Sequence, residues 1–159
     1  MERGLRALAT ALALAGGALL VGLAGLTVAS ISGRWLASRP ITGDVELVQL
    51  GVAAAIALFL PYCQLHRSHL IVDFFTARSS GPVQRRLDAI GSAVAGAVFL
   101  LLAWRAGAAV LDMRAAGETT MVLGVPLWLP YAAMVPGLAL AGVTGVLAAV
   151  RPAQAAGER

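Results

Sequence analysis

Residues 47–65 read LVQLGVAAAIALFLPYCQL, and this stretch decides the fold because it contains no charged side chain. A helix needs about 20 predominantly apolar residues to cross the hydrocarbon core of a bilayer. Leu47–Leu65 approaches that length and follows directly after Glu46. The sequence therefore predicts a membrane-spanning helix here, and three other stretches of the chain share its character.

The composition of the whole chain favours a lipid environment. Its 159 residues are 59% hydrophobic and 13% charged, and the mean hydropathy is +0.83. Soluble domains have about 45–50% apolar and about 25% charged residues. The composition excludes a disordered chain, a disulfide scaffold and a coiled coil, and it argues against a soluble globular enzyme. The single cysteine, Cys63, excludes an intrachain disulfide and a thiolate zinc site.

The three further predicted spans are residues 7–31, 89–111 and 130–150. The first resembles a signal peptide in its flanks, but its apolar stretch exceeds the roughly 7–15 residues of a signal-peptide core. We therefore favour a retained helix. The last span is expected to start near Pro130, because proline is tolerated in the first turn of a helix. Pro136 lies one to two turns further on and marks the expected position of any kink.

The arginines predict how these spans are oriented. All 12 basic residues are arginine, and the pI is about 10.6. They form no basic stripe, so we expect membrane lipid rather than nucleic acid as a partner. Eight arginines lie on one side of the spans, which predicts that both termini and the middle loop are cytoplasmic and that loops 32–45 and 112–125 face outward. The eight are Arg3, Arg6, Arg67, Arg78, Arg85, Arg86, Arg151 and Arg159; Arg34, Arg39 and Arg114 lie on the other side, with Arg105 near them.

The segment between the second and third spans has a pattern of its own. Its apolar residues recur at helical spacing, and a second face is polar; the two sets are Leu70, Ile71, Phe74 and Phe75, and His66, His69 and Asp73. This predicts a short amphipathic helix over about 66–78, lying in the membrane surface. The predicted fold class is thus an all-α integral membrane protein, a single domain over residues 1–159 with four transmembrane helices and this interfacial helix.

The same segment contains the only histidines, grouped with Arg67. His66, His69 and Asp73 could bind a metal, but a third nitrogen or thiolate ligand is missing. A solvated polar face with an ordinary i,i+4 pair explains them more simply. A haem would need axial histidines on facing spans. We therefore expect no metal and no cofactor, and a redox or haem-anchor protein remains an alternative.

Glu46 and Arg105 are charges at similar predicted depth, near the outer ends of the second and third spans. Charges at membrane depth are costly and often pair or mark a pathway. A substrate or ion site is one interpretation. We favour a structural ion pair, or an Arg105 that extends toward the membrane surface. A free-standing small multidrug exporter is a further alternative, but it would need a carboxylate deep inside a span, which is absent here.

Small residues form stripes along two spans, and aromatic residues cluster near the outer boundary. Stripes of small residues let helices approach closely, and interfacial aromatics form a belt. No ATP-binding or nucleophile motif occurs, so no catalytic residue is assigned. The stripes are Ala11, Ala15, Ala18, Gly22, Gly25 and Ala29, and Ala133, Gly137, Ala141, Gly145 and Ala149; the belt is Trp35, Trp104, Trp128 and Tyr131.

Several short motifs follow one another in a characteristic order. Glu46 opens the second span, a Leu-Ile-Val-Asp segment ends at Asp73, and a Trp-Arg pair stands at Trp104 and Arg105. The stretch Gly117–Tyr131 reads GETTMVLGVPLWLPY, and Met134–Gly137 reads MVPG. In this order the chain resembles the small permease subunit, the Q or DctQ-like subunit, of tripartite ATP-independent periplasmic (TRAP) transporters, over roughly Arg3 to Val150.

The resemblance implies a function. Such a subunit joins a large permease subunit that carries the transport domain and sodium sites, and a periplasmic substrate-binding protein delivers the substrate, usually an organic acid. The small subunit would be a static scaffold in the bacterial inner membrane, without catalytic or substrate-binding residues. Residues expected at subunit or lipid interfaces, or in structural roles, are Glu46, Arg67, Asp73, Trp104, Arg105, Glu118, Thr119, Thr120, Pro126, Trp128, Tyr131, Pro136 and Gly137.

Overall fold

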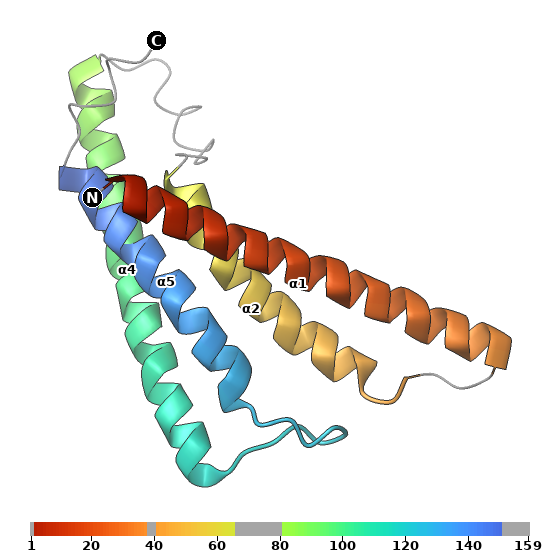
Figure 1. Ribbon diagram of the computed structural model, residues 1–159. Coiled ribbons are helices and arrows are strands. Elements are labelled where there is room, and N and C mark those ends of the chain that lie inside the picture. The colour runs from red at the N-terminus through yellow and green to blue at the C-terminus, as the bar shows by residue number, and fades with distance from the viewer. Residues whose placement is uncertain (1, 38–40, 66–80, 151–159) are drawn as a thin grey trace.

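The computed structural model describes residues 2–37, 41–65 and 81–150, which form four helices (Figure 1). Each helix is long and apolar enough to cross a membrane, which confirms the four predicted spans. The predicted amphipathic helix at 66–78 lies outside the described residues. The helices are α1 (Glu2–Ala37), α2 (Asp44–Leu65), α4 (Gly81–Ala116) and α5 (Trp128–Val150).

Two of the helices are longer than their apolar stretches. α1 and α4 have 36 residues each, and such a helix is roughly 54 Å long at 1.5 Å per residue. Both continue past charged residues, because arginine is a good helix former and the end of an apolar run is no signal to stop. α5 begins at Trp128, two residues before the start expected near Pro130, and takes Pro130 into its first turn. The helix continues through Pro136.

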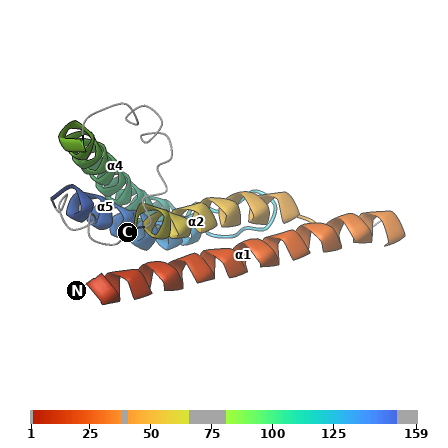
Figure 2. The same cartoon turned by 90° about the horizontal axis from the view of Figure 1, so that it is seen from above.

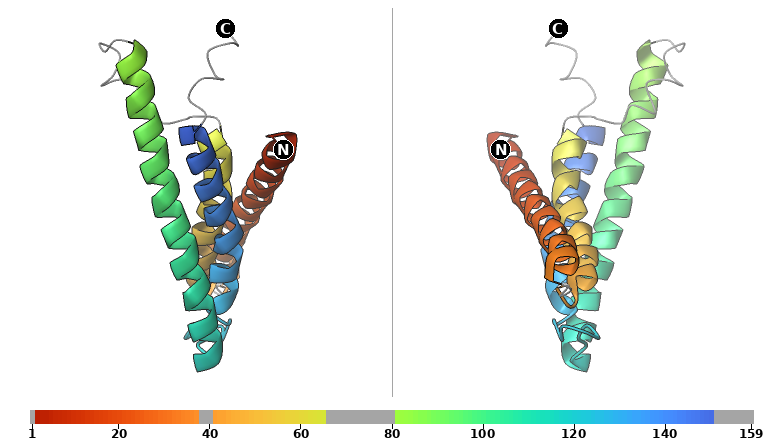
Figure 3. Two further views of the ribbon diagram at one scale, coloured as in Figure 1. Left: turned by 90° about the vertical axis from the view of Figure 1, so that its left-hand side faces the viewer. Right: turned by 90° about the vertical axis from the view of Figure 1, so that its right-hand side faces the viewer.

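The four helices form an open row and not a closed bundle. α1 packs on α2, α2 on α5 and α5 on α4, so that α1 and α4 lie on opposite sides of the central α2–α5 pair (Figures 2 and 3). Burial follows this order. In the most apolar 18-residue stretch of each helix, the share of buried residues is 28% for α2 and 39% for α5, against 6% for α1 and 11% for α4. The two flanking helices therefore present most of their surface outward.

The two ends of the molecule differ. α1 begins and α5 ends at one end, which we call the terminal end (Figure 3). Residues 41–43 and 117–127 lie at the opposite end, which we call the loop end. From the crossing of α2 and α5, the α1–α2 pair and the α4–α5 pair diverge toward the loop end (Figure 1).

Glycines bring α5 into backbone contact with both α2 and α4. A β-carbon on Gly137 of α5 would overlap the carbonyl oxygen of Ala57 on α2. A β-carbon on Gly96 of α4 would lie 2.7 Å from the backbone nitrogen of Val146 on α5. Close approach of this kind gains many dispersion contacts that bulkier residues would prevent. The stripe predicted on the last span is confirmed at its centre, since Gly137, Ala141 and Gly145 are buried.

The stripe predicted on the first span makes no contact with the other described helices. Gly22 and Gly25 have no atom of a neighbouring helix within 4 Å of a β-carbon position, and the whole stripe is exposed. The face of α1 that contacts α2 instead contains Gly16, Leu23 and Ser30, which are seven residues apart, and the buried Ala9 continues this series toward the N-terminus. A seven-residue repeat is typical of two helices that coil gently around each other. In a chain this rich in alanine and glycine, several faces have small residues, and only the facing helix selects one.

Candidate functional site

The loop between α4 and α5 is folded by its own backbone. Gly117, with φ +65°, ends α4 because it adopts the left-handed conformation that glycine favours. The amide of the next residue, Glu118, donates to the carbonyl of Met113 over 3.1 Å, which completes a Schellman cap. Leu127 N donates to the Glu118 carbonyl over 3.0 Å. The motif GETT thus begins with a helix stop.

A short hairpin follows. Thr119 pairs with Pro126 in an antiparallel bridge. Thr120 N donates to the Val125 carbonyl over 2.9 Å, and Val125 N donates back to the Thr120 hydroxyl over 3.1 Å. Gly124, at φ +67°, permits the reversal between them. The predicted site residues Thr119, Thr120 and Pro126 therefore shape the loop.

Glu46 of α2 binds the tip of this hairpin. Its Oε1 accepts the amide of Val122 over 3.0 Å, and its Oε2 accepts the amide of Leu123 over 3.2 Å. The Thr120 side chain and the Met121 amide also interact with the carboxylate. Hydrogen bonds from amides to an ionised carboxylate are stronger than neutral ones. A single side chain therefore ties the α4–α5 loop to the beginning of α2.

The same contact has an apolar half. Gly43 precedes α2 with φ +83°, and a β-carbon there would overlap the side chain of Leu123. Leu123 thus donates its amide to Glu46 and packs its side chain over Gly43. We call this group of Gly43, Glu46, Val122 and Leu123 the loop-end contact. It connects the α1–α2 pair to the α4–α5 pair at the end of the molecule where the two pairs diverge (Figure 1).

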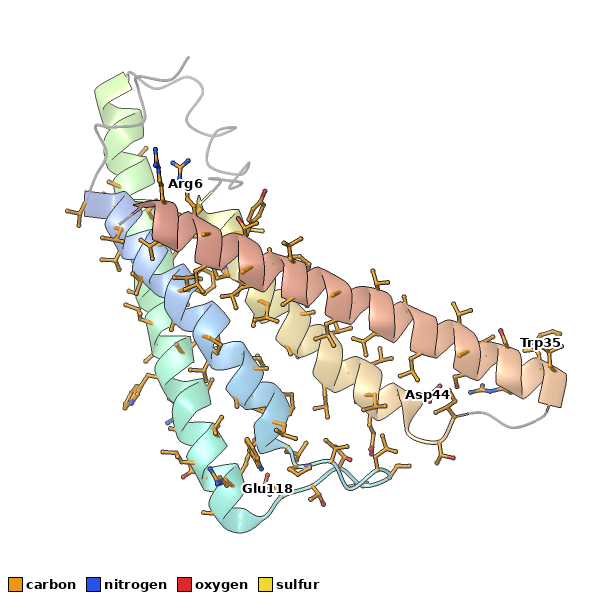
Figure 4. The ribbon with its side chains drawn as sticks, viewed as in Figure 1. Arg6, Trp35, Asp44 and Glu118 are labelled. Carbon is orange, nitrogen blue, oxygen red and sulfur yellow. The ribbon has the colours of Figure 1, made fainter. Side chains whose placement is uncertain are left out.

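A second polar contact joins α1 to α2 beside it. The buried Ser30 hydroxyl donates to Oδ2 of Asp44, and the amide of Ile41 donates to Ser30 Oγ over 3.3 Å. Figure 4 shows Asp44 at the beginning of α2, beside the last turns of α1. Sequence reasoning missed both residues. The available signal was a hydroxyl near the end of one span and an acid near the start of the next.

An arginine–tryptophan contact joins α4 to α5. The guanidinium carbon of Arg114 lies 5.4 Å from the centre of the Trp128 ring, within range of a cation–π interaction. Arg114 is in the last turn of α4, where a cation also interacts favourably with the helix dipole. Trp128, predicted as a belt residue and among the interface or structural residues, holds the two ends of the loop together.

The ion pair expected between Glu46 and Arg105 is absent from the structure. The Glu46 carboxylate is occupied by loop amides. Arg105 is exposed on α4, and its side chain has no hydrogen bond, ion pair or ring contact with any described residue. The expectation was wrong because it used depth alone, whereas α5 lies between α2 and α4 in the row of helices.

The other predicted site residues are dispersed. Trp104 is exposed on α4 next to Arg105, and Glu118 is exposed in the loop (Figure 4). Tyr131 is half-buried near the start of α5, and Pro136 is exposed beside the buried Gly137. Arg67 and Asp73, like His66 and His69, lie outside the described residues. Within residues 2–37, 41–65 and 81–150 no group of three His, Cys, Asp or Glu side chains could hold a metal ion.

These features define a class of protein: a multi-pass membrane protein whose helix pairs are fixed to each other by a folded loop. The chain belongs to the family described as tripartite ATP-independent periplasmic transporters, DctQ component, whose family model matches residues 23–155. The match includes α2, α4 and α5 and the second part of α1. No curated protein and no solved structure matches the chain. The protein is therefore a membrane component of a tripartite transporter, as the order of its motifs indicated.

Proposed function

We propose that this chain is the small subunit that scaffolds the large permease subunit of a TRAP transporter. The large subunit would take up an organic acid delivered by a periplasmic substrate-binding protein, driven by a sodium gradient. The observation that carries the scaffold role is the backbone contact at the helix crossings, Gly137 on Ala57 and Gly96 on Val146. A carrier needs elements with two packing arrangements. Helices that meet through glycine have little freedom to slide, because side chains on either side of the contact would collide.

The placement of acidic residues supports the same role. Coupling ions bind near the middle of the membrane in secondary transporters, and intramembrane carboxylates mark such sites. Each Asp or Glu in the described part of the chain lies within about two helical turns of a helix end, or in a loop. Under this proposal the sodium sites belong to the large subunit. The loop-end contact keeps the small subunit in one shape while its partner moves.

Reconstitution into vesicles tests the division of labour. With a sodium gradient, this chain alone should give no uptake of a panel of radiolabelled organic acids. Uptake should appear when the large permease subunit and the substrate-binding protein are both present, and it should disappear when any of the three is omitted. Uptake by this chain alone would contradict the proposal and favour a free-standing exporter. A visible haem spectrum of the purified chain would instead favour a redox anchor.

The orientation in the membrane is a separate prediction. Eight arginines predict that both termini are cytoplasmic, and α1 begins at the same end of the molecule at which α5 ends. A reporter active only in the cytoplasm should therefore give signal when fused after Arg159, and a reporter active only in the periplasm should not. Fusions within the 117–127 loop should show the reverse pattern. The opposite result at both positions would invert the topology.

A further inference from the structure

Arg105 stands on the outer side of a flanking helix. α4 contacts α5 through Gly96, Leu100 and Ala103. At 3.6 residues per turn, Arg105 lies about two and a half turns from Gly96 and therefore on the opposite side of α4. Its side chain is exposed and has no polar contact with any described residue. The described residues of this chain therefore provide no partner for the charge.

The position of Arg105 along α4 is costly for a cation. Residues 89–104 before it are uncharged, and the next charged residue, Asp112, is roughly 10 Å further along the helix at 1.5 Å per residue. A charge at such depth is expensive unless it reaches water or a partner. Cα–Cβ bonds in a helix tilt toward the N-terminus, which for Arg105 is away from the nearer end of the span. That direction opposes extension toward the headgroups at the loop end.

The surface around Arg105 fits another helix. Val94, Val98 and Leu101 precede it at steps of four, three and four residues, and all three are about half exposed or more. This spacing of about 3.5 residues forms a straight apolar stripe when two helices pack at a small angle. Arg105 continues the stripe as its one charged member.

We propose that Arg105 pairs with an acidic side chain on a membrane-spanning helix of a second chain, which packs along Val94, Val98 and Leu101. This inference rests on the proposed function, under which the second chain is the large permease subunit. The charge complementarity fixes the chemistry of the partner: an Asp or Glu at the depth of Arg105. The pair would set the register of the two helices, because an unpaired arginine there is costly at every other register.

The test is binding of the large permease subunit to variants of this chain in nanodiscs. Arg105→Met should weaken binding at least about tenfold, and Arg105→Glu should weaken it further through like-charge repulsion. Arg105→Lys should retain most of the wild-type affinity, because lysine keeps the positive charge, and should lose the remainder because it lacks the planar guanidinium that binds a carboxylate through two hydrogen bonds. The matched control is Arg6→Met, an exposed arginine near the start of α1 (Figure 4), which should bind as wild type does. None of the variants should change the melting temperature of the chain alone.

Three results would overturn the inference. If wild type and Arg105→Glu bind the large subunit equally well, the pair does not exist, although the proposed function stands. If wild type does not bind the large subunit at all, the proposed function fails and the pair with it. If anionic lipid raises the melting temperature of the isolated chain only when Arg105 is present, Arg105 binds a lipid headgroup and not a partner helix.

Discussion

Replacing Gly137 with alanine is expected to lower the melting temperature of the protein in detergent by roughly 5 to 10 °C. The added β-carbon would overlap the carbonyl oxygen of Ala57, and backbone cannot rotate away as a side chain can. α5 must then move from α2 at their crossing, which loosens the centre of the molecule. Forcing extra methyl groups into a packed interior costs about 1–3 kcal/mol, and about 1 kcal/mol shifts a domain of this size by roughly 2–4 °C. The steric overlap places this substitution at the upper end.

Gly22→Ala is the matched control. Gly22 is exposed in α1, with no atom of a neighbouring helix near a β-carbon position, and alanine is the better helix former. The melting temperature should therefore stay the same or rise slightly. Thermal melts of both variants, followed by circular dichroism and by retention of the monodisperse gel-filtration peak, separate the two cases. Equal melting temperatures for Gly137→Ala and Gly22→Ala would show that the α2–α5 crossing is wider than described.

Replacing Glu46 with alanine is expected to release the α4–α5 loop from α2. The amides of Val122 and Leu123 lose their acceptor, and the apolar packing of Leu123 over Gly43 is left to hold the contact alone. Amide hydrogen exchange in the peptide containing residues 121–124 should become about tenfold faster, because the carboxylate no longer protects these groups. The melting temperature should fall by only a few degrees, since the helix crossings remain.

Two controls define what Glu46 does. Glu118→Ala removes an exposed carboxylate from the same loop and should leave exchange at residues 121–124 unchanged. The double variant of Glu46→Ala with Arg105→Met should be additive in melting temperature, because the two side chains share no contact. A coupling energy between Glu46 and Arg105 would show that the two side chains form an ion pair, in disagreement with the structure. If hydrogen exchange at residues 121–124 is unchanged in Glu46→Ala, Glu46 does not hold the loop and the loop-end contact does not form.

The features that could be predicted from the sequence are those that depend on residues close together in the chain. The uncharged run at 47–65 and its three counterparts predicted four spans, because crossing a bilayer depends on length and apolarity alone. The start of α5 near Pro130 was predictable for a similar reason: proline in a first turn loses no hydrogen bond. The order of motifs from Glu46 to Gly137 indicated the family, which the match over residues 23–155 confirms.

Contacts between helices could not be predicted from the sequence in the same way. Equal depth suggested that Glu46 and Arg105 pair, but α5 separates their helices and the carboxylate binds loop amides. The sequence does not indicate which backbone amides will bind the Glu46 carboxylate, because every residue except proline has a backbone N–H that can donate a hydrogen bond. The stripe of small residues on α5 is buried at its centre, whereas the one on α1 faces away from the other described helices.

The sequence by itself determined that this chain is an all-helical membrane protein, how many times it crosses, and which transporter family it belongs to. Only the tertiary structure decided that the helices form an open row, that α2 and α5 cross at Gly137, and that Glu46 holds the α4–α5 loop. The physical reason is that a span is specified by transfer of its own residues into lipid, which is a sum over one segment. Packing is specified by pairs of surfaces, and in a chain where small apolar residues cover every face, the pairs are chosen only when the helices meet.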